Sequence, residues 1–144
     1  MMDDFHANVA TRLLHEEQRY THNRRAIVEV LEATDRPLTI AEIRNRRGLA
    51  QSSVYRNLTV LEAAKVVHRI TSSDEFARYE LTEDLTDHHH HHLICSSCGG
   101  VADFTVSSQL ERALEKAMGR VAADTGFRPE HHRLDLIGVC AHCS

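Results

Sequence analysis

The chain has 144 residues, enough for one domain or two small ones, and 42% of them are apolar. Its net charge is −4, and no apolar run is long enough for a transmembrane helix. Residues 1–4 lack the basic and apolar regions of a signal peptide, so we expect a cytoplasmic protein whose four cysteines are reduced.

The first half of the chain has the pattern of helices that each bury one face, because apolar residues recur every three or four positions. The predicted helices and their apolar residues are, in chain order, 5–17 with Phe5, Val9 and Leu13; 21–35 with Ile27, Val30 and Leu31; 39–48 with Ile43; and 53–63 with Val54, Leu58 and Leu61. Thr39 and Glu42 have the spacing of a capping box, and Ser52 or Ser53 is expected to cap the last of these helices.

Two predicted strands follow the helices. Residues 66–70 are rich in β-branched side chains, residues 72–75 are typical of a turn, and residues 76–81 form the second strand candidate. Three helices followed by a hairpin are the order of a winged helix-turn-helix. Residues 18–69 contain ten Lys+Arg and five Asp+Glu, a net of +5, which indicates either a nucleic-acid surface or simply a solvated helical surface.

The second half of the chain is predicted to be α+β. Residues 83–87 are short, polar and acidic, and we interpret them as a hinge between a winged-helix domain over 1–82 and a second domain over 88–144. The elements expected after the hinge are a strand around residues 92–94, a tight turn at 95–100, a strand at 101–104, a helix from a capping box at 108–111 to Gly126, and a strand at 133–139.

Four cysteines form two Cys-x-x-Cys turns that are 41 residues apart, namely Cys95 and Cys98 with Cys140 and Cys143. Zinc favours four tetrahedral ligands, and thiolate sulfur suits it. Because four protein ligands leave no open position, the predicted zinc is structural. A pair of disulfides or a redox motif is the alternative, but disulfides rarely persist in the cytoplasm and a redox motif does not occur twice in this way.

Five consecutive histidines, residues 88–92, precede Cys95. If this segment is extended, its side chains point alternately to opposite faces, with His88, His90 and His92 on one face and His89 and His91 on the other. One strand then serves two metal sites. Imidazole binds Zn, Fe(II), Ni and Cu, so the segment does not identify the metal. The alternatives are a solvated polyhistidine loop or a purification tag, and the internal position of the run argues against a tag.

Four motifs in order resemble the ferric uptake regulator superfamily over about residues 18–143. They are the histidine run with its Cys-x-x-Cys-Gly at 88–99, the Ser-Val-Tyr-Arg-Asn-Leu at 53–58, the His-His-Arg-Leu at 131–134 and the closing Cys-x-x-Cys at 140–143. The resemblance implies a metal-dependent, homodimeric transcription factor with an N-terminal winged helix and a C-terminal α/β dimerisation domain that holds the four-cysteine zinc.

The resemblance also implies a role for individual residues. The regulatory metal ligands are Glu80, His90 and His92, and the ligands of an additional site are His89, His91, Glu115 and His132, with Glu111 as the alternative to Glu115. Iron- and peroxide-sensing members take a further regulatory ligand from a position that holds Pro37 here, which has no donor. Zinc-sensing members take one from the first wing strand, where His68 lies, so His68 is either the fourth ligand or a surface residue.

The recognition helix of a helix-turn-helix lies in the major groove, where Tyr55 and Arg56 are the expected contacts and Arg56 can pair with guanine. Tyr55 could instead be a half-buried core residue. The other residues expected at DNA are Ser52, Ser53, Arg19, Arg24 and Arg25, with the arginines on phosphates.

The predicted function is metal-activated repression of metal-uptake genes by a homodimer that binds inverted-repeat DNA when the hinge site is filled. The sensed metal is expected to be zinc, slightly favoured over Fe²⁺, and the donor set also tolerates Mn²⁺ or Ni²⁺. The alternatives are a zinc-dependent hydrolase, and a metal store or chaperone without specific DNA binding.

Overall fold

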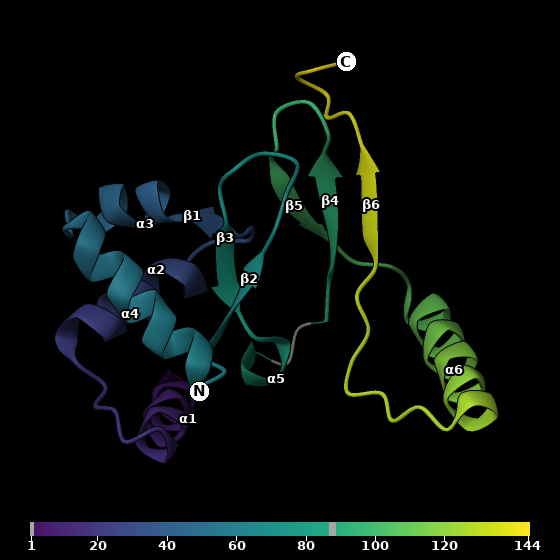
Figure 1. Ribbon diagram of the computed structural model, residues 1–144, viewed down its shortest axis with the longest axis horizontal. Helices are drawn as coiled ribbons and strands as arrows, with labels where there is room; N and C mark the ends of the chain where they lie inside the picture. The colour runs from purple at the N-terminus through teal and green to yellow at the C-terminus, as the bar shows by residue number, and fades with distance from the viewer. Residues whose placement is uncertain (1, 87–88) are drawn as a thin grey trace.

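The computed structural model describes residues 2–86 and 89–144 (Figure 1). Asp87 and His88, which the sequence assigns to the hinge and to the histidine run, lie outside the described residues. The elements in chain order are α1 (Met2–His15), α2 (His22–Glu32), β1 (Leu38–Thr39), α3 (Ile40–Arg47), α4 (Gln51–Ala63), β2 (Val67–Ile70), β3 (Arg78–Leu81), α5 (Glu83–Thr86), β4 (His91–Cys95), β5 (Val101–Phe104), α6 (Ser108–Thr125) and β6 (Asp135–Gly138). No helix among the described residues is long and apolar enough to cross a membrane.

The N-terminal helices pack around one apolar core. The predicted apolar faces of α1, α2 and α4 are buried in it together with Ile43 of α3. The capping box at the start of α3 is confirmed, because Thr39 Oγ1 accepts from the Glu42 amide at 3.2 Å and Glu42 accepts from the Thr39 amide at 3.0 Å. The predicted cap of α4 is wrong: the N-cap is Ala50, without a side-chain bond, and Ser52 and Ser53 lie inside the first turn.

The hairpin of β2 and β3 follows the helices and completes a winged helix-turn-helix, as predicted. The sheet has the order β1-β3-β2, with His68 directly opposite Glu80. The two residues of β1 are too few for a recognisable strand pattern, so the sequence did not indicate it. The predicted hinge contains the single-turn helix α5, which is joined to α1 by an ion pair between Arg12 and Asp84 at 3.0 Å.

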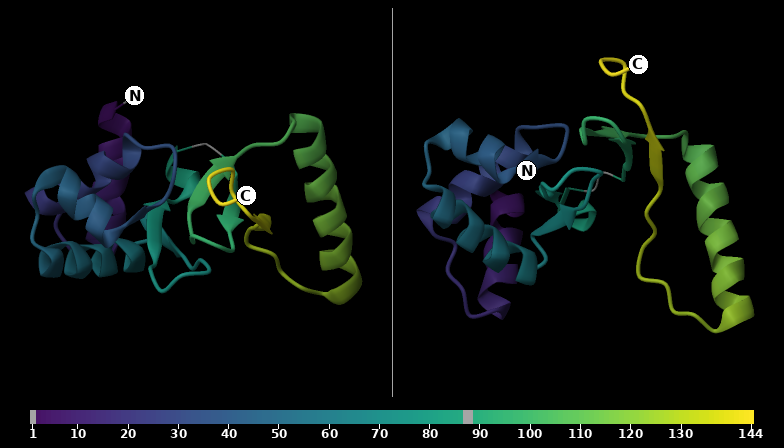
Figure 2. Two further views of the ribbon diagram at one scale, coloured as in Figure 1. Left: turned by 90° about the horizontal axis from the view of Figure 1, so that it is seen from above. Right: turned by 45° about the horizontal axis from the view of Figure 1, so that its top comes forward.

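The second domain is a sheet with the strand order β5-β4-β6, in which β5 is antiparallel and β6 parallel to β4. The wing hairpin lies between this sheet and the N-terminal helices (Figure 1). Helix α6 ends at Gly126 as predicted, but its cap is Ser107, which accepts from the Leu110 amide at 3.2 Å. The expected capping box at 108–111 is therefore wrong by one position. All of α6 is described, and none of its residues is buried, because the helix projects from the sheet (Figure 2).

Candidate metal centres and DNA-binding surface

The four cysteines form one cluster at the end of the second sheet. Cys95 ends β4, Cys98 follows in the turn to β5, and Cys140 and Cys143 lie just beyond β6. Their sulfur atoms all lie within 4.8 Å of one another, and the thiols are free. The sulfur atoms of Cys98 and Cys140 are 3.9 Å apart, close to the ~3.8 Å expected of two thiolates on a tetrahedral zinc.

The backbone around Cys95 favours a thiolate. The amides of Cys98 and Cys140 each donate to Cys95 Sγ at 3.4 Å. These hydrogen bonds lower the pKa of the Cys95 thiol to about 6, so the sulfur is charged and ready to bind metal at neutral pH. The donor set and its spacing fit the structural zinc that the sequence predicts.

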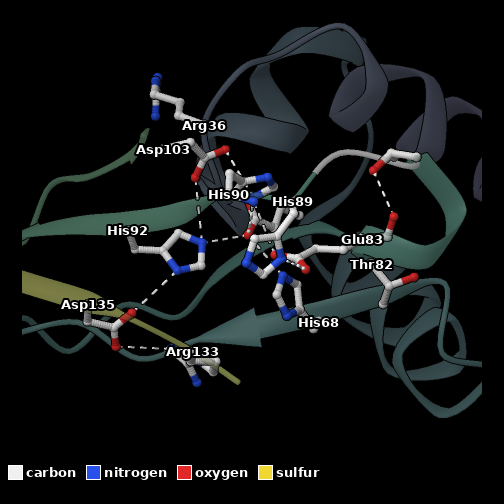
Figure 3. Close-up of polar contacts among 12 residues, drawn as sticks. Arg36, His68, Thr82, Glu83, His89, His90, His92, Asp103, Arg133 and Asp135 are labelled. Atoms are coloured by element: carbon white, nitrogen blue, oxygen red, sulfur yellow. Dashed lines mark hydrogen bonds and ion pairs between the residues drawn. The ribbon is translucent and has the colours of Figure 1, made fainter. Parts of the chain in front are cut away.

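A second cluster lies where the wing meets the second sheet. Glu80 of β3 faces His90, His92 and Asp103, and one donor atom from each lies within 4.8 Å of the others. Glu80 Oε1 lies 3.0 Å from His90 Nε2 and 2.6 Å from His92 Nε2. Figure 3 shows His92 between Asp103 on one side and Asp135 on the other. We call Glu80, His90, His92 and Asp103 the hinge cluster.

The buried carboxylates of the hinge cluster favour a bound cation. Burial, together with the neighbouring Glu80 carboxylate, raises the pKa of Asp103 to about 7, and Asp103 Oδ1 is buried without a hydrogen-bond partner among the described residues. The hydrogen bond to Glu80 raises the pKa of His90 to about 9. Although burial opposes it, hydrogen bonds from histidines lower the pKa of Glu80. Two buried carboxylates beside two imidazoles form a donor set that a divalent first-row metal satisfies.

Asp103 was not among the predicted ligands, although the sequence carries a signal for it. Asp103 is the one acidic residue in the predicted strand 101–104, and the register pairs it directly with His92. An acidic side chain opposite a buried histidine is a candidate ligand. Sequence alone did not show which strand β5 would pair with, so the proximity could not be derived.

His68 and the segment around Pro37 both lie near the hinge cluster. His68 Nε2 is 2.9 Å from Glu80 Oε1, although His68 is outside the group of four mutually close donors. Arg36, the neighbour of Pro37, lies beyond Asp103 in Figure 3 and pairs with Glu42 at 2.6 Å. Arg36 also lines a cleft of about 970 Å³ that borders the hinge cluster and gives it access to solvent.

A third cluster lies on the opposite face of the histidine segment. It contains His89, His91, His132 and Glu111, with one donor atom of each within 4.8 Å of the others. The sequence assigned Glu115 to this position, and the structure corrects that assignment to Glu111. Because Ser107 caps α6, Glu111 is in the first turn beside β4, whereas Glu115 is one turn further out and exposed.

The third cluster also fits a cation. His132 Nε2 and His91 Nδ1 are buried without hydrogen-bond partners among the described residues, and the buried Glu111 Oε2 lies 3.0 Å from His89 Nε2 and 3.8 Å from His132 Nε2. His91 Nε2 contacts Glu111 Oε1. The Nδ1 atom of His89 lies 2.7 Å from Glu83 Oε2 of α5, which orients the ring so that Nε2 faces the cluster. A carboxylate on the second nitrogen is the usual support of a metal-binding histidine.

The side chains of β4 and the residues just before it therefore supply both histidine clusters. His90 and His92 face the wing, and His89 and His91 face α6, as the alternation predicts. The structure places the other expected residues together, with three differences: Asp103 joins the hinge cluster, His68 contacts Glu80 but lies outside the group of four, and Glu111 replaces Glu115.

The expected DNA-contacting residues gather on α4 and the start of α2. Tyr55 is 61% exposed, so it is not a core residue, and Arg56 is exposed beside it. Ser52, Arg19 and Arg25 are exposed, and Ser53 is half-buried.

Arg24 is engaged within the domain. Its guanidinium donates to Asn57 Oδ1 at 3.0 Å and to the Arg19 carbonyl oxygen at 2.8 Å. The bond to Asn57 joins α2 to α4, so Arg24 also positions α4.

A winged-helix domain that shares a metal-binding cluster with an α/β domain defines a metal-responsive DNA-binding protein. Comparisons with known proteins agree. The Ferric uptake regulator family matches residues 15–137. The ferric uptake regulation protein of Bacillus subtilis (strain 168) is 33% identical over 114 residues, which are 79% of this chain and 72% of that protein.

Solved structures show the same fold. The Helicobacter pylori ferric uptake regulator, described as having three functional metal binding sites, aligns with a TM-score of 0.73 at 22% identity, over 99% of this chain and 93% of that one. A zinc-bound manganese uptake regulator aligns with a TM-score of 0.62 at 32% identity, over 93% of this chain and 97% of that one.

The chain therefore belongs to the ferric uptake regulator family. It is a metal-dependent transcriptional regulator and not an enzyme, which rules out the hydrolase interpretation.

Proposed function

We propose that this protein is a homodimeric repressor of metal-homeostasis genes, which binds inverted-repeat DNA when the hinge cluster holds a divalent metal. The observation that carries the proposal is the origin of the hinge cluster. Glu80 comes from the wing of the DNA-binding domain, whereas His90, His92 and Asp103 come from the second sheet. Ligation by all four residues would tie the two domains together.

The chain's own residues explain why the metal-free state resists this arrangement. Asp103 is a buried acid, and its ionised form is disfavoured by burial and by the neighbouring Glu80 carboxylate, which hydrogen bonds from histidines keep ionised. A bound cation would supply the positive charge that lets both carboxylates ionise in contact. The closed arrangement of the domains would thereby gain population. A change from about 1% to about 99% closed needs roughly 5.5 kcal/mol of preferential binding.

A homodimer is supported by the apolar surface of the second domain. Leu110, Met118 and Val121 of α6 and Leu136 and Ile137 of β6 are exposed in the protomer. An isolated helix that projects from its domain needs an apolar partner, and a second copy of the chain offers the same surface. Two-fold symmetry then presents two α4 helices to two half-sites, which is why we propose an inverted-repeat operator.

The ligand atoms of the hinge cluster influence which metal ion it prefers. The sequence slightly favours zinc over Fe(II) at a site of His68, Glu80, His90 and His92. Asp103 adds a second carboxylate, and oxygen donors favour harder ions, which supports Fe(II) or Mn(II) as the sensed metal. The third cluster is proposed as an additional metal site of the same ion classes, and the cysteine cluster as the structural zinc.

The test is selection from a random DNA pool. Protein that retains one zinc per chain is offered the pool with no further metal, or with Zn(II), Fe(II) or Mn(II). We expect inverted repeats to be enriched only with added metal, and no enrichment with a His90→Ala, His92→Ala variant. His15→Ala, which alters an exposed histidine of α1, is the matched control. Equal enrichment without metal contradicts the proposal, and metal binding without any enrichment supports the storage alternative.

A further inference from the structure

The turn between β2 and β3 rests on the first Cys-x-x-Cys turn. We call residues 71–77 the wing turn and residues 95–100 the zinc turn. In Figure 1 both turns lie at the same end of the molecule, although they belong to different domains. Ser72 Oγ donates to the Gly99 carbonyl oxygen at 2.7 Å, and Ser73 Oγ donates to the Cys95 carbonyl oxygen at 2.8 Å. The sequence predicted a turn here but indicated nothing about its contacts.

The two turns also fit closely in shape. A Cβ atom added at Gly99 would lie 2.2 Å from Asp74 Oδ2, and Gly99 has a φ of +78°, so only glycine suits this position. Asp74 is fixed in turn by Arg78, whose nitrogens lie 2.9 Å from its two oxygens. Arg78 is buried, so the wing turn has a rigid base.

Apolar packing continues below the hydrogen bonds. Ile70 of β2 is buried against Ile94 of β4 and Val101 of β5. These three residues form a small core of their own, apart from the core of the N-terminal helices. The wing is therefore attached to the second sheet by a polar contact at its tip and an apolar contact next to it.

We propose that the zinc turn is a docking platform for the wing and that Ser72 and Ser73 are positioning residues for the hinge cluster. The inference rests on the proposed role of that cluster in metal binding. Glu80 lies on β3, which follows the wing turn. His90 and His92 lie just before the zinc turn, at the start of β4. The wing is thus held at two places, the tip and the cluster. Contact at the tip restricts how far Glu80 moves from the histidines.

In this arrangement the cysteine cluster also holds the acceptor groups of the wing contact in place. The carbonyl oxygens that accept from Ser72 and Ser73 belong to Gly99 and Cys95, which lie within or directly beside the first Cys-x-x-Cys pair. The conformation of the zinc turn therefore determines whether the acceptors are in place. Order in the zinc turn is transmitted to the hinge cluster through the wing.

The experiment compares the full chain with a Ser72→Ala, Ser73→Ala variant. Both proteins are checked to retain one zinc per chain. All proteins compared carry Glu111→Gln, so that binding at the third cluster is weakened and the hinge cluster is read separately. Affinity for a second metal is measured with Co(II) by competition with a chelator, because bands of nitrogen and oxygen ligation differ from those of four thiolates. We expect the affinity to fall roughly ten-fold, equivalent to about 1.4 kcal/mol. Ser72→Thr, Ser73→Thr, which keeps the hydroxyl groups, should restore it, and Ser108→Ala on exposed α6 is the matched control.

A second readout needs no bound regulatory metal. With only the structural zinc present, amide hydrogen exchange in β2 and β3 should be faster in the alanine variant than in the unaltered chain. Unchanged exchange overturns the docking, and faster exchange with unchanged Co(II) affinity overturns the positioning role. Failure of the proposed function is separate, because it would be seen as metal-independent DNA binding by the unaltered chain.

Discussion

One carboxylate in each histidine cluster, Asp103 in the hinge cluster and Glu111 in the third cluster, is expected to contribute strongly to metal affinity. In the hinge cluster, the pKa of Asp103 is raised because Asp103 lies buried beside the Glu80 carboxylate. An acid with a raised pKa destabilises the folded state once pH exceeds its ordinary pKa. With the hinge cluster empty and the cysteine zinc retained, the contribution of Asp103 to the free energy of unfolding is therefore expected to fall as pH rises from about 4 to about 7.

Asp103→Asn should separate the two effects of this carboxylate. With the hinge cluster empty and the cysteine zinc retained, the variant should melt at a higher temperature than the unaltered chain at pH 7, by a free energy on the order of 1 kcal/mol or more. Its affinity for the regulatory metal should fall at least roughly ten-fold, because a charged ligand is lost. Calorimetry with and without metal measures both, and a variant with unchanged metal affinity would remove Asp103 from the cluster.

Glu111 and Glu115 provide a matched pair at the third cluster. Glu111→Gln should weaken metal binding there by roughly ten-fold or more, because Glu111 is the half-buried carboxylate that faces the three histidines. Glu115→Gln changes an exposed residue one helical turn away and should leave binding unchanged. Metal titration of protein with the hinge cluster disabled distinguishes them, and the reverse result would restore the sequence-based assignment.

At the scale of elements, α2 and α4 form one unit, which we propose as the DNA-binding surface. Arg24 bonds to Asn57 and to the Arg19 carbonyl oxygen, whereas Arg56 is exposed on α4. The two arginines should therefore behave differently when removed.

Arg56→Ala should weaken binding to the selected operator by about 1–3 kcal/mol and leave the melting temperature of the protein unchanged. Arg24→Ala should lower the melting temperature, because it removes the hydrogen bond to Asn57 that joins α2 to α4 and the bond to the Arg19 carbonyl oxygen. Anisotropy of labelled DNA and thermal unfolding are the measurements. If Arg56→Ala lowers only the stability, Arg56 does not contact DNA.

The elements also show where sequence reasoning succeeds and where it stops. Helix faces, the cap of α3, the wing strands and the alternation of histidines are local patterns, so periodicity and capping chemistry predicted them. The start of α6 is one residue earlier than predicted, at the cap Ser107. Counting back from Gly126 selects Glu115 over Glu111, because helical spacing alone does not show which turn of α6 faces the histidines. Asp103 and the contact of Ser72 with Gly99 depend on pairing between distant segments, which no local pattern specifies.

At the scale of the whole molecule, the exposed apolar residues of α6 and β6 require a partner. Val121→Glu should convert the proposed homodimer into a monomer, because a carboxylate would be buried in an apolar interface. Leu14→Glu is the matched control, since Leu14 is also an exposed apolar residue of a helix but lies on α1. Sedimentation equilibrium of zinc-retaining protein measures the mass, and a dimeric Val121→Glu variant would place the interface elsewhere.

The alternation along β4 has a consequence for how the strand is aligned. A slip of one residue would turn every side chain to the opposite face. Within a run of identical histidines such a slip costs little, because one imidazole takes the place of another. Ile94 and Cys95 cannot slip, since Ile94 would leave its contact with Ile70 and Cys95 would leave the other thiols. Ile94 and Cys95 therefore fix the register of β4, and this register decides which histidines belong to which metal site.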